Sequence, residues 1–111
     1  MERIAEKFEH YLDLLSTRQK VVASNIANAD TPGYKTRDID FQFEFQSQLE
    51  NSQPNVYEVT GLQAKNDGNN VQLDREMRLL SENALRFQLA SNLARDQLRS
   101  IQTAIQEGRS G

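Results

Sequence analysis

The sequence predicts a mainly α protein: long N- and C-terminal helices pair as a coiled-coil core, with a short extended segment and loops between them. Two apolar stripes of helical spacing, one near each end, predict the helices. Between them, Gly, Pro and Asn gather in stretches typical of loops. We therefore divide one structural domain into an N-terminal helix within residues 1–32, a connector over residues 33–70 and a C-terminal helix within residues 71–111.

The first helix is expected from about Glu2 to Asn28. Its apolar residues follow 4-3-4-7 spacing, with Arg18 in the skipped position. They are Ile4, Phe8, Tyr11, Leu15 and Val22. Pro32 and Gly33 then predict a firm stop, because proline has no amide hydrogen to donate and glycine favours turns.

The connector begins with apolar and polar residues in alternation, which predicts a β-strand from Ile39 to Phe45 with three phenylalanines on one face. The stretches "ENSQPN" and "KNDGNN" have the composition of loops. Between these two loops, "VYEVTGL" predicts a second short strand.

The last helix is expected from Val71 to about Glu107, with Asn69 and Asn70 as N-terminal caps and Gly108 as the stop. Ten positions alternate 4-3 spacing, and nine of them are apolar. We call these ten the seam: Leu73, Met77, Leu80, Ala84, Phe87, Ser91, Ala94, Leu98, Ile101 and Ile105. A strict period of 3.5 residues predicts a coiled coil. At 1.5 Å per residue this helix would be roughly 50 Å long.

A second stripe on the same helix, formed by Leu85, Leu89 and Leu93, leaves two interpretations open. One is a wider buried face in a compact helical bundle. The other is a long helix that touches several neighbouring subunits at once, since one antiparallel partner could not cover both stripes.

Charge and composition exclude several classes of protein. The chain has 111 residues, 13 basic and 16 acidic, with both signs scattered, so it lacks the basic patch of a nucleic-acid-binding protein. A membrane-surface helix would need a more basic polar face, and no apolar run is long enough to span a bilayer. The N-terminal residues lack the apolar core of a secretory signal.

The residues needed for catalysis or metal binding are sparse. Cysteine is absent, and the single histidine, His10, has no second ligand at metal-binding spacing. Asp38 and Asp40 form a possible carboxylate pair, but solvated charge opposite an apolar face is the simpler interpretation. The glycines form no phosphate-binding loop. We expect no enzyme activity, cofactor or metal site, and a structural or interaction protein instead.

One stretch, "ASNIANADTPGYKTRDIDF", closely resembles the N-terminal signature of the bacterial flagellar rod, hook and hook-associated proteins. Three features resemble the proximal rod proteins within that group: the short length of the chain, the stretch "RDIDF", and the stretch "GNNVQLDREMRLLSENALRFQ" before the last helix. The resemblance covers nearly the whole chain, although the connector from Glu50 to Asn66 looks short. A cytoplasmic coiled-coil interaction protein is the alternative; it would explain the seam but not the Asn-rich signature.

The resemblance implies an axial core domain whose paired end helices stack helically around a central channel. Two sets of residues are then expected at subunit interfaces. They are the signature residues Asn25, Asn28, Thr31, Pro32, Gly33 and Tyr34, and the seam residues Leu73, Met77, Leu80, Phe87, Leu98, Ile101 and Ile105.

The resemblance also implies partners and a location. The partners are other rod proteins, the adaptor that joins the rod to the membrane ring, and the flagellar type III export gate. Proteins of this family are exported unfolded, without a cleaved signal peptide, and assemble in the periplasm. Phe45 and Leu49 match the Phe-x-x-x-apolar element that the gate recognises in early substrates.

Overall fold

Two long helices dominate the protein, which confirms the predicted mainly α fold. The computed structural model describes residues 2–47 and 53–110. The elements run in the order α1 (Glu2–Ala27), β1 (Arg37–Ile39), α2 (Phe41–Ser47), β2 (Val56–Glu58) and α3 (Leu73–Ser110). The molecule measures 72 × 25 × 18 Å, and its radius of gyration of 18.7 Å exceeds the roughly 13 Å of a globule of this length.

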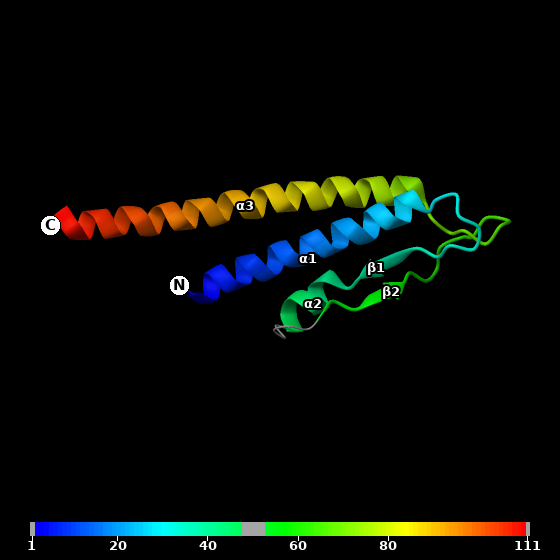
Figure 1. The fold of residues 1–111 in the computed structure, drawn as a ribbon, viewed down its shortest axis with the longest axis horizontal. Coiled ribbons are helices and arrows are strands. Elements are labelled where there is room, and N and C mark those ends of the chain that lie inside the picture. The colour runs from blue at the N-terminus through cyan, green and yellow to red at the C-terminus, as the bar shows by residue number, and fades with distance from the viewer. Residues whose placement is uncertain (1, 48–52, 111) are drawn as a thin grey trace.

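Helix α1 lies between the other two parts of the molecule. It runs antiparallel to α3 on one side, and α2 and the two short strands lie along its other side (Figure 1). Leu15 and Val22 of the predicted stripe are each 1% exposed, which confirms that part of the stripe. Leu14, outside the stripe, is buried as well, as expected for a helix that is covered on two sides.

The strands form one short antiparallel hairpin, in which Arg37 pairs with Glu58 and Ile39 pairs with Val56. The second predicted strand is therefore confirmed. The first is wrong beyond Ile39, because residues Phe41–Ser47 form the helix α2.

An N-terminal cap and ring packing against α1 explain why residues Phe41–Ser47 form a helix. Asp40 caps its N-terminus: the carboxylate Oδ1 accepts a hydrogen bond from Phe43 N at 3.2 Å. The helical period places Phe41 and Phe45 on one face, and both rings pack edge-on against Tyr11 of α1, with centroids 5.3 and 5.6 Å away. Phe43 stays 63% exposed, so the alternation in the sequence does not form a strand face.

Both predicted ends of the last helix need correction. Helix α3 continues through Gly108 to Ser110, because glycine in a helix costs only about 1 kcal/mol and Gly108 lacks the left-handed backbone of a stop. At the other end, Asn69 and Asn70 precede the first helical residue, Leu73, by several positions. Their side chains bind other parts of the chain instead.

The face of α3 that contacts α1 is displaced from the predicted seam. The buried positions are Glu76, Asn83 and Ala90, spaced seven residues apart. Asn83 Nδ2 donates hydrogen bonds to Leu15 O at 2.8 Å and to Gln19 Oε1 at 3.0 Å. The seam lies beside this face, so a single α1 helix covers it only in part.

Candidate functional site

The signature "ASNIANADTPGYKT" and the motif "GNNVQLDRE" meet at the end of the molecule where α1 stops and α3 begins (Figure 1). We call this meeting point the junction; it comprises residues 24–38 and 65–76. Sequence analysis selected both stretches but did not bring them together, because about 30 residues of connector separate them.

Asn25 is the centre of the junction and is fully buried. Its Nδ2 donates to Arg37 O at 2.8 Å and to Glu76 Oε2 at 3.1 Å. Its Oδ1 accepts from Arg37 N and from the Tyr34 hydroxyl, both at 3.1 Å. These four bonds use the full capacity of a carboxamide group. One side chain thus joins α1, the start of β1 and the first turn of α3.

A buried ion cluster adjoins Asn25. Arg18 of α1 binds both carboxylate oxygens of Asp38 at 3.2 Å, and Arg75 of α3 reaches Asp38 Oδ2 at 3.3 Å. Arg75 also binds Glu76 Oε1 at 2.6 Å. Two cations therefore balance two anions, as buried charges require. The prediction that Asp38 is solvated is wrong, since Asp38 is only 4% exposed and joins both long helices to β1.

Asn69 holds the turn that follows α1. Its Nδ2 donates to the carbonyl oxygens of Asn28 and Thr31, at 2.8 Å each. Its Oδ1 accepts from Val71 N at 2.8 Å. Both carbonyls belong to the turn after α1 and also accept backbone hydrogen bonds within that turn, from Thr31 N and Tyr34 N. Asn69 therefore ties the end of α1 to the segment that leads into α3.

Asn70 makes a similar connection to the next part of the turn. Its Oδ1 accepts from Thr36 N at 2.7 Å, and its carbonyl oxygen accepts from the Thr36 hydroxyl at 3.2 Å. Both residues are buried. Sequence analysis assigned Asn70 to a helix cap, although pairing across 34 positions is its role in the structure.

Two glycines shape the turns. Gly33 and Gly68 have φ angles of 76° and 88°, in the left-handed region that other residues rarely adopt. Gly33 N donates to Asp67 O at 2.9 Å, and a Cβ on Gly68 would lie 3.4 Å from Gly33 Cα. The two turns therefore pack closely, and Lys35 Nζ reaches across to Gly68 O.

The six signature residues differ in accessibility. Asn25 is buried, Asn28 and Tyr34 are half-buried, and three adjacent residues form an exposed tip: Thr31, Pro32 and Gly33. Asn28 bonds within its own turn, since its Oδ1 accepts from the Thr31 hydroxyl at 3.0 Å. The junction is thus internally satisfied and offers its tip to solvent. A contact between these residues and a neighbouring subunit stays a prediction.

The seam residues are the second part of the candidate site. Leu80 and Ile101 are half-buried, whereas five others are 43–57% exposed: Leu73, Met77, Phe87, Leu98 and Ile105. Leu85, Leu89 and Leu93 of the second stripe are 52–64% exposed. Large apolar side chains in such number along one helix are typical of a surface for association, and a contact between these residues and a neighbouring subunit stays a prediction.

Two residues considered for other roles, Phe45 and His10, lie where α2 packs on α1. Phe45 is half-buried, and its ring stacks on His10 of α1 at 5.8 Å between centroids. Leu49 lies outside the described residues. His10 Nε2 donates to Glu44 O at 3.0 Å, which ties α2 to α1. Over the part of the chain that the structure describes, neither long helix is apolar enough to cross a membrane.

The fold and the junction define a class of structural subunit: an elongated helical rod with interlocked turns at one end and open apolar faces along its length. The sequence profile of a family described as "Flagella basal body rod protein" matches residues 12–35. That range covers the second half of α1 and the signature turn through Tyr34.

Curated relatives agree over most of the chain. The flagellar basal body rod protein FlgB of Salmonella typhimurium is 33% identical, over 87% of this chain and 88% of its own length. FlgB of Borrelia hermsii is 31% identical, over 86% and 90%, and FlgB of Escherichia coli K12 is 30% identical, over 87% and 88%.

The chain belongs to the FlgB family of flagellar basal body rod proteins. Its function class is a structural subunit of the flagellar basal body rod, and the cytoplasmic coiled-coil alternative is not favoured. This family is not a class of enzymes.

Proposed function

We propose that this chain builds the proximal part of the rod by stacking helically with its own copies and with related rod proteins. The resulting hollow shaft would transmit torque and form part of the export conduit, without catalysis by the chain. One observation carries the proposal: seam residues such as Met77 and Leu98 remain more than half exposed in the single chain. Burial of such apolar area against another helix is favourable, because it removes the area from water.

The geometry of the junction also supports this proposal. Its buried ion cluster and the hydrogen bonds of Asn25 fix the angle between the end of α1 and the start of α3. A rigid joint of this kind keeps the exposed faces in one arrangement in each subunit. Uniform subunits are what a helical stack requires.

A deletion strain tests this function. Loss of the gene should abolish motility, and purified basal bodies should lack both rod and hook. Complementation with the Met77→Asp variant should fail, because a charge would enter a seam contact, whereas the matched variant Asn92→Asp changes an exposed polar position of α3 and should restore motility. Normal rods in the deletion strain would contradict the proposal.

The partners and location follow from the same proposal. We expect the chain to contact the adaptor that joins rod and membrane ring, to act in the periplasm, and to keep its N-terminal helix uncleaved. Crosslinking followed by mass spectrometry of purified basal bodies checks the contact with the adaptor and the intact N-terminal helix. Recovery of a chain that has lost the first turns of α1 would contradict export without cleavage.

Recognition by the export gate is proposed for Phe45 and Leu49. In the folded chain Phe45 packs on His10 and Tyr11, so the element would be accessible only before folding. The double variant F45A/L49A should secrete poorly, while Phe43→Ala, in the same helix, should secrete normally. Normal secretion of F45A/L49A would remove this role.

A further inference from the structure

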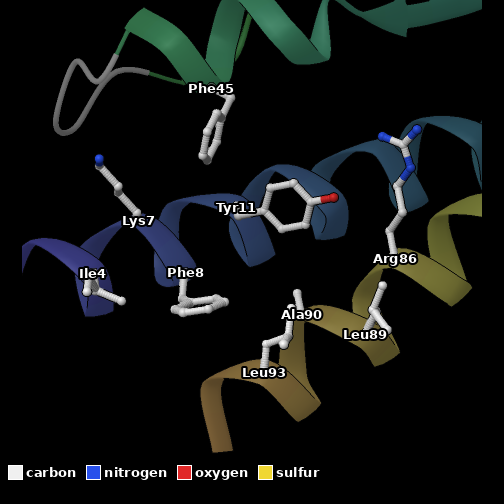
Figure 2. A pocket seen from close by; sticks show the side chains of 9 residues that line it. All are labelled: Ile4, Lys7, Phe8, Tyr11, Phe45, Arg86, Leu89, Ala90 and Leu93. Carbon is white, nitrogen blue, oxygen red and sulfur yellow. The ribbon is translucent and has the colours of Figure 1, made fainter. Parts of the chain in front are cut away.

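An apolar groove opens between α1 and α3 near the N-terminal end of α1, with a volume of about 370 Å³. Figure 2 shows Phe8 of α1 pointing toward Leu93 of α3 across it, and Phe45 of α2 approaching from above. Leu89 and Leu93 are 59% and 52% exposed, so the chain itself leaves the groove open.

The lining of the groove favours a helix over a small molecule. Small-molecule sites place a few polar groups that converge on the ligand. Here the charged ends of Lys7 and Arg86 point away from Phe8 and Leu93 (Figure 2). An apolar groove between two helices suits the apolar face of a third helix.

The chain itself supplies such a helix end. Helix α3 has 38 residues and α1 has 26, a difference of 12 residues or roughly 18 Å. The C-terminal end of α3 therefore extends beyond the N-terminus of α1 (Figure 1). We call residues 94–108, which comprise most of this extension and the turn of α3 that precedes it, the overhang. Its residues Leu98 and Ile105 are 57% and 51% exposed.

The overhang continues the face of α3 that packs on α1. At about 100° per residue, Ile101 falls on the same line as Asn83 and Ala90, which are buried against α1. An arc of about 120° around that line carries no charge over four turns. Its residues are Ala94, Gln97, Leu98, Ile101, Ala104, Ile105 and Gly108. The same kind of surface thus persists beyond the N-terminus of α1.

The two surfaces also match in length. Helix α1 lines the groove from Ile4 to Tyr11, seven positions apart, and Leu98 and Ile105 are seven positions apart on the overhang; each span is roughly 10 Å. We propose that the overhang of one copy seats in the groove of a second copy. This inference rests on the proposed rod function, for which it names the contact.

The contact has a consequence for symmetry. Groove and overhang are different surfaces of one chain, so their pairing is head-to-tail and leaves a free groove and a free overhang at the two ends of any pair. Head-to-tail contacts generate a ring where the rotation closes and an open helical assembly where it does not, and an open helical assembly is what the proposed rod requires.

Disulfide trapping in basal bodies tests the contact, because the natural chain has no cysteine. The double variants L89C/L98C and L89C/I105C each place one cysteine in the groove and one on the overhang. Within one chain these positions lie at least nine residues, roughly 14 Å, apart on one helix, too far for a disulfide. The control Q88C/T103C uses exposed positions of the same helix: Gln88 does not line the groove, and Thr103 lies on the opposite face of the overhang from its uncharged arc.

After oxidation, at least one of the two variants should give a ladder of dimers, trimers and larger species, several-fold stronger than the control. Each single variant should give little crosslinking. Motile cells whose rods contain the chain but show no ladder above the control would overturn the contact and leave the rod function standing. Crosslinks to a different protein instead would also overturn it, whereas absence of the chain from rods would refute the rod function itself.

Discussion

Asn25 on α1 donates a hydrogen bond to Glu76 on α3 at 3.1 Å, although 51 positions separate them and neither is exposed to solvent. Asn25 belongs to the N-terminal signature and Glu76 to the motif that opens the last helix. Their bond explains why the two motifs occur together in one chain: each supplies partners that the other needs once both are buried. Four predictions on the stability of the chain follow from this arrangement and its surroundings.

Replacement of Asn25 by alanine should lower the free energy of unfolding by about 2–3 kcal/mol, because the buried carboxylate of Glu76 and the partly buried groups of Arg37 and Tyr34 would lose a partner. Asn28→Ala removes a partly exposed amide and should lower it by less than about 1 kcal/mol. Urea unfolding followed by circular dichroism measures both. Equal losses for the two variants would show that Asn25 is not the centre of the junction.

Asp38→Ala should destabilise the chain by about 2–4 kcal/mol, since Arg18 and Arg75 would be left close together without their shared anion. Its neighbour Asp40 is exposed and caps α2, so Asp40→Ala should lower stability by about 1 kcal/mol. The same unfolding measurement applies. A smaller loss of stability for Asp38→Ala than for Asp40→Ala would contradict this prediction. It would indicate that Asp38 is solvated, as the sequence alone suggested.

Alanine should lower the stability of the chain at one glycine, Gly68, but not at another, Gly108. Gly68→Ala forces an alanine into a backbone with φ of 88° beside Gly33, which should lower stability by about 1–2 kcal/mol. Gly108→Ala should raise the helix content of α3 and leave stability unchanged or higher by about 0.5 kcal/mol, because position 108 is helical. Helix content and melting temperature from circular dichroism decide the question. A loss of stability in Gly108→Ala would restore Gly108 as a helix stop.

The phenylalanines of α2 should respond unequally to substitution. Phe45→Ala removes ring contacts with Tyr11 and His10 and should cost about 1–2 kcal/mol. Phe43→Ala, at a position 63% exposed, should change stability by less than about 0.5 kcal/mol. Both are measured by denaturant unfolding of the purified chain. Similar losses for the two would instead favour a strand with all its phenylalanines on one face.

The positions of the two long helices could be read from the sequence with good accuracy, because apolar spacing reports helical period directly. The first helix ends at Ala27, one residue before the predicted Asn28, and the hairpin strand within "VYEVTGL" is present as Val56–Glu58. The local sequence pattern gave the wrong element where it was compatible with both a strand period and a helical period. Phe41, Phe43 and Phe45 suit a strand by alternation, yet Tyr11 of α1 binds two of these rings at once, and that contact favours the helix.

The face by which α3 meets α1 could not be selected from the apolar pattern of the sequence. Apolar periodicity selected the seam, but the buried line runs through Glu76, Asn83 and Ala90, a polar and small set that only a facing helix could identify. A seven-residue spacing one step from the seam was the available signal. That spacing identifies a buried face only when the groups on α1 that face it are known, such as Leu15 O, which accepts a hydrogen bond from Asn83.

By itself, the sequence determined two long helices, a turn signature between them and an excess of apolar surface, since propensity and periodicity are local properties. The tertiary structure alone decided which polar groups are buried: Asp38, Asn69 and Glu76 look solvent-exposed by type, and only partners drawn from distant segments make their burial favourable. It also decided which apolar residues stay exposed, because the C-terminal end of α3 extends beyond the N-terminus of α1 and leaves the overhang uncovered.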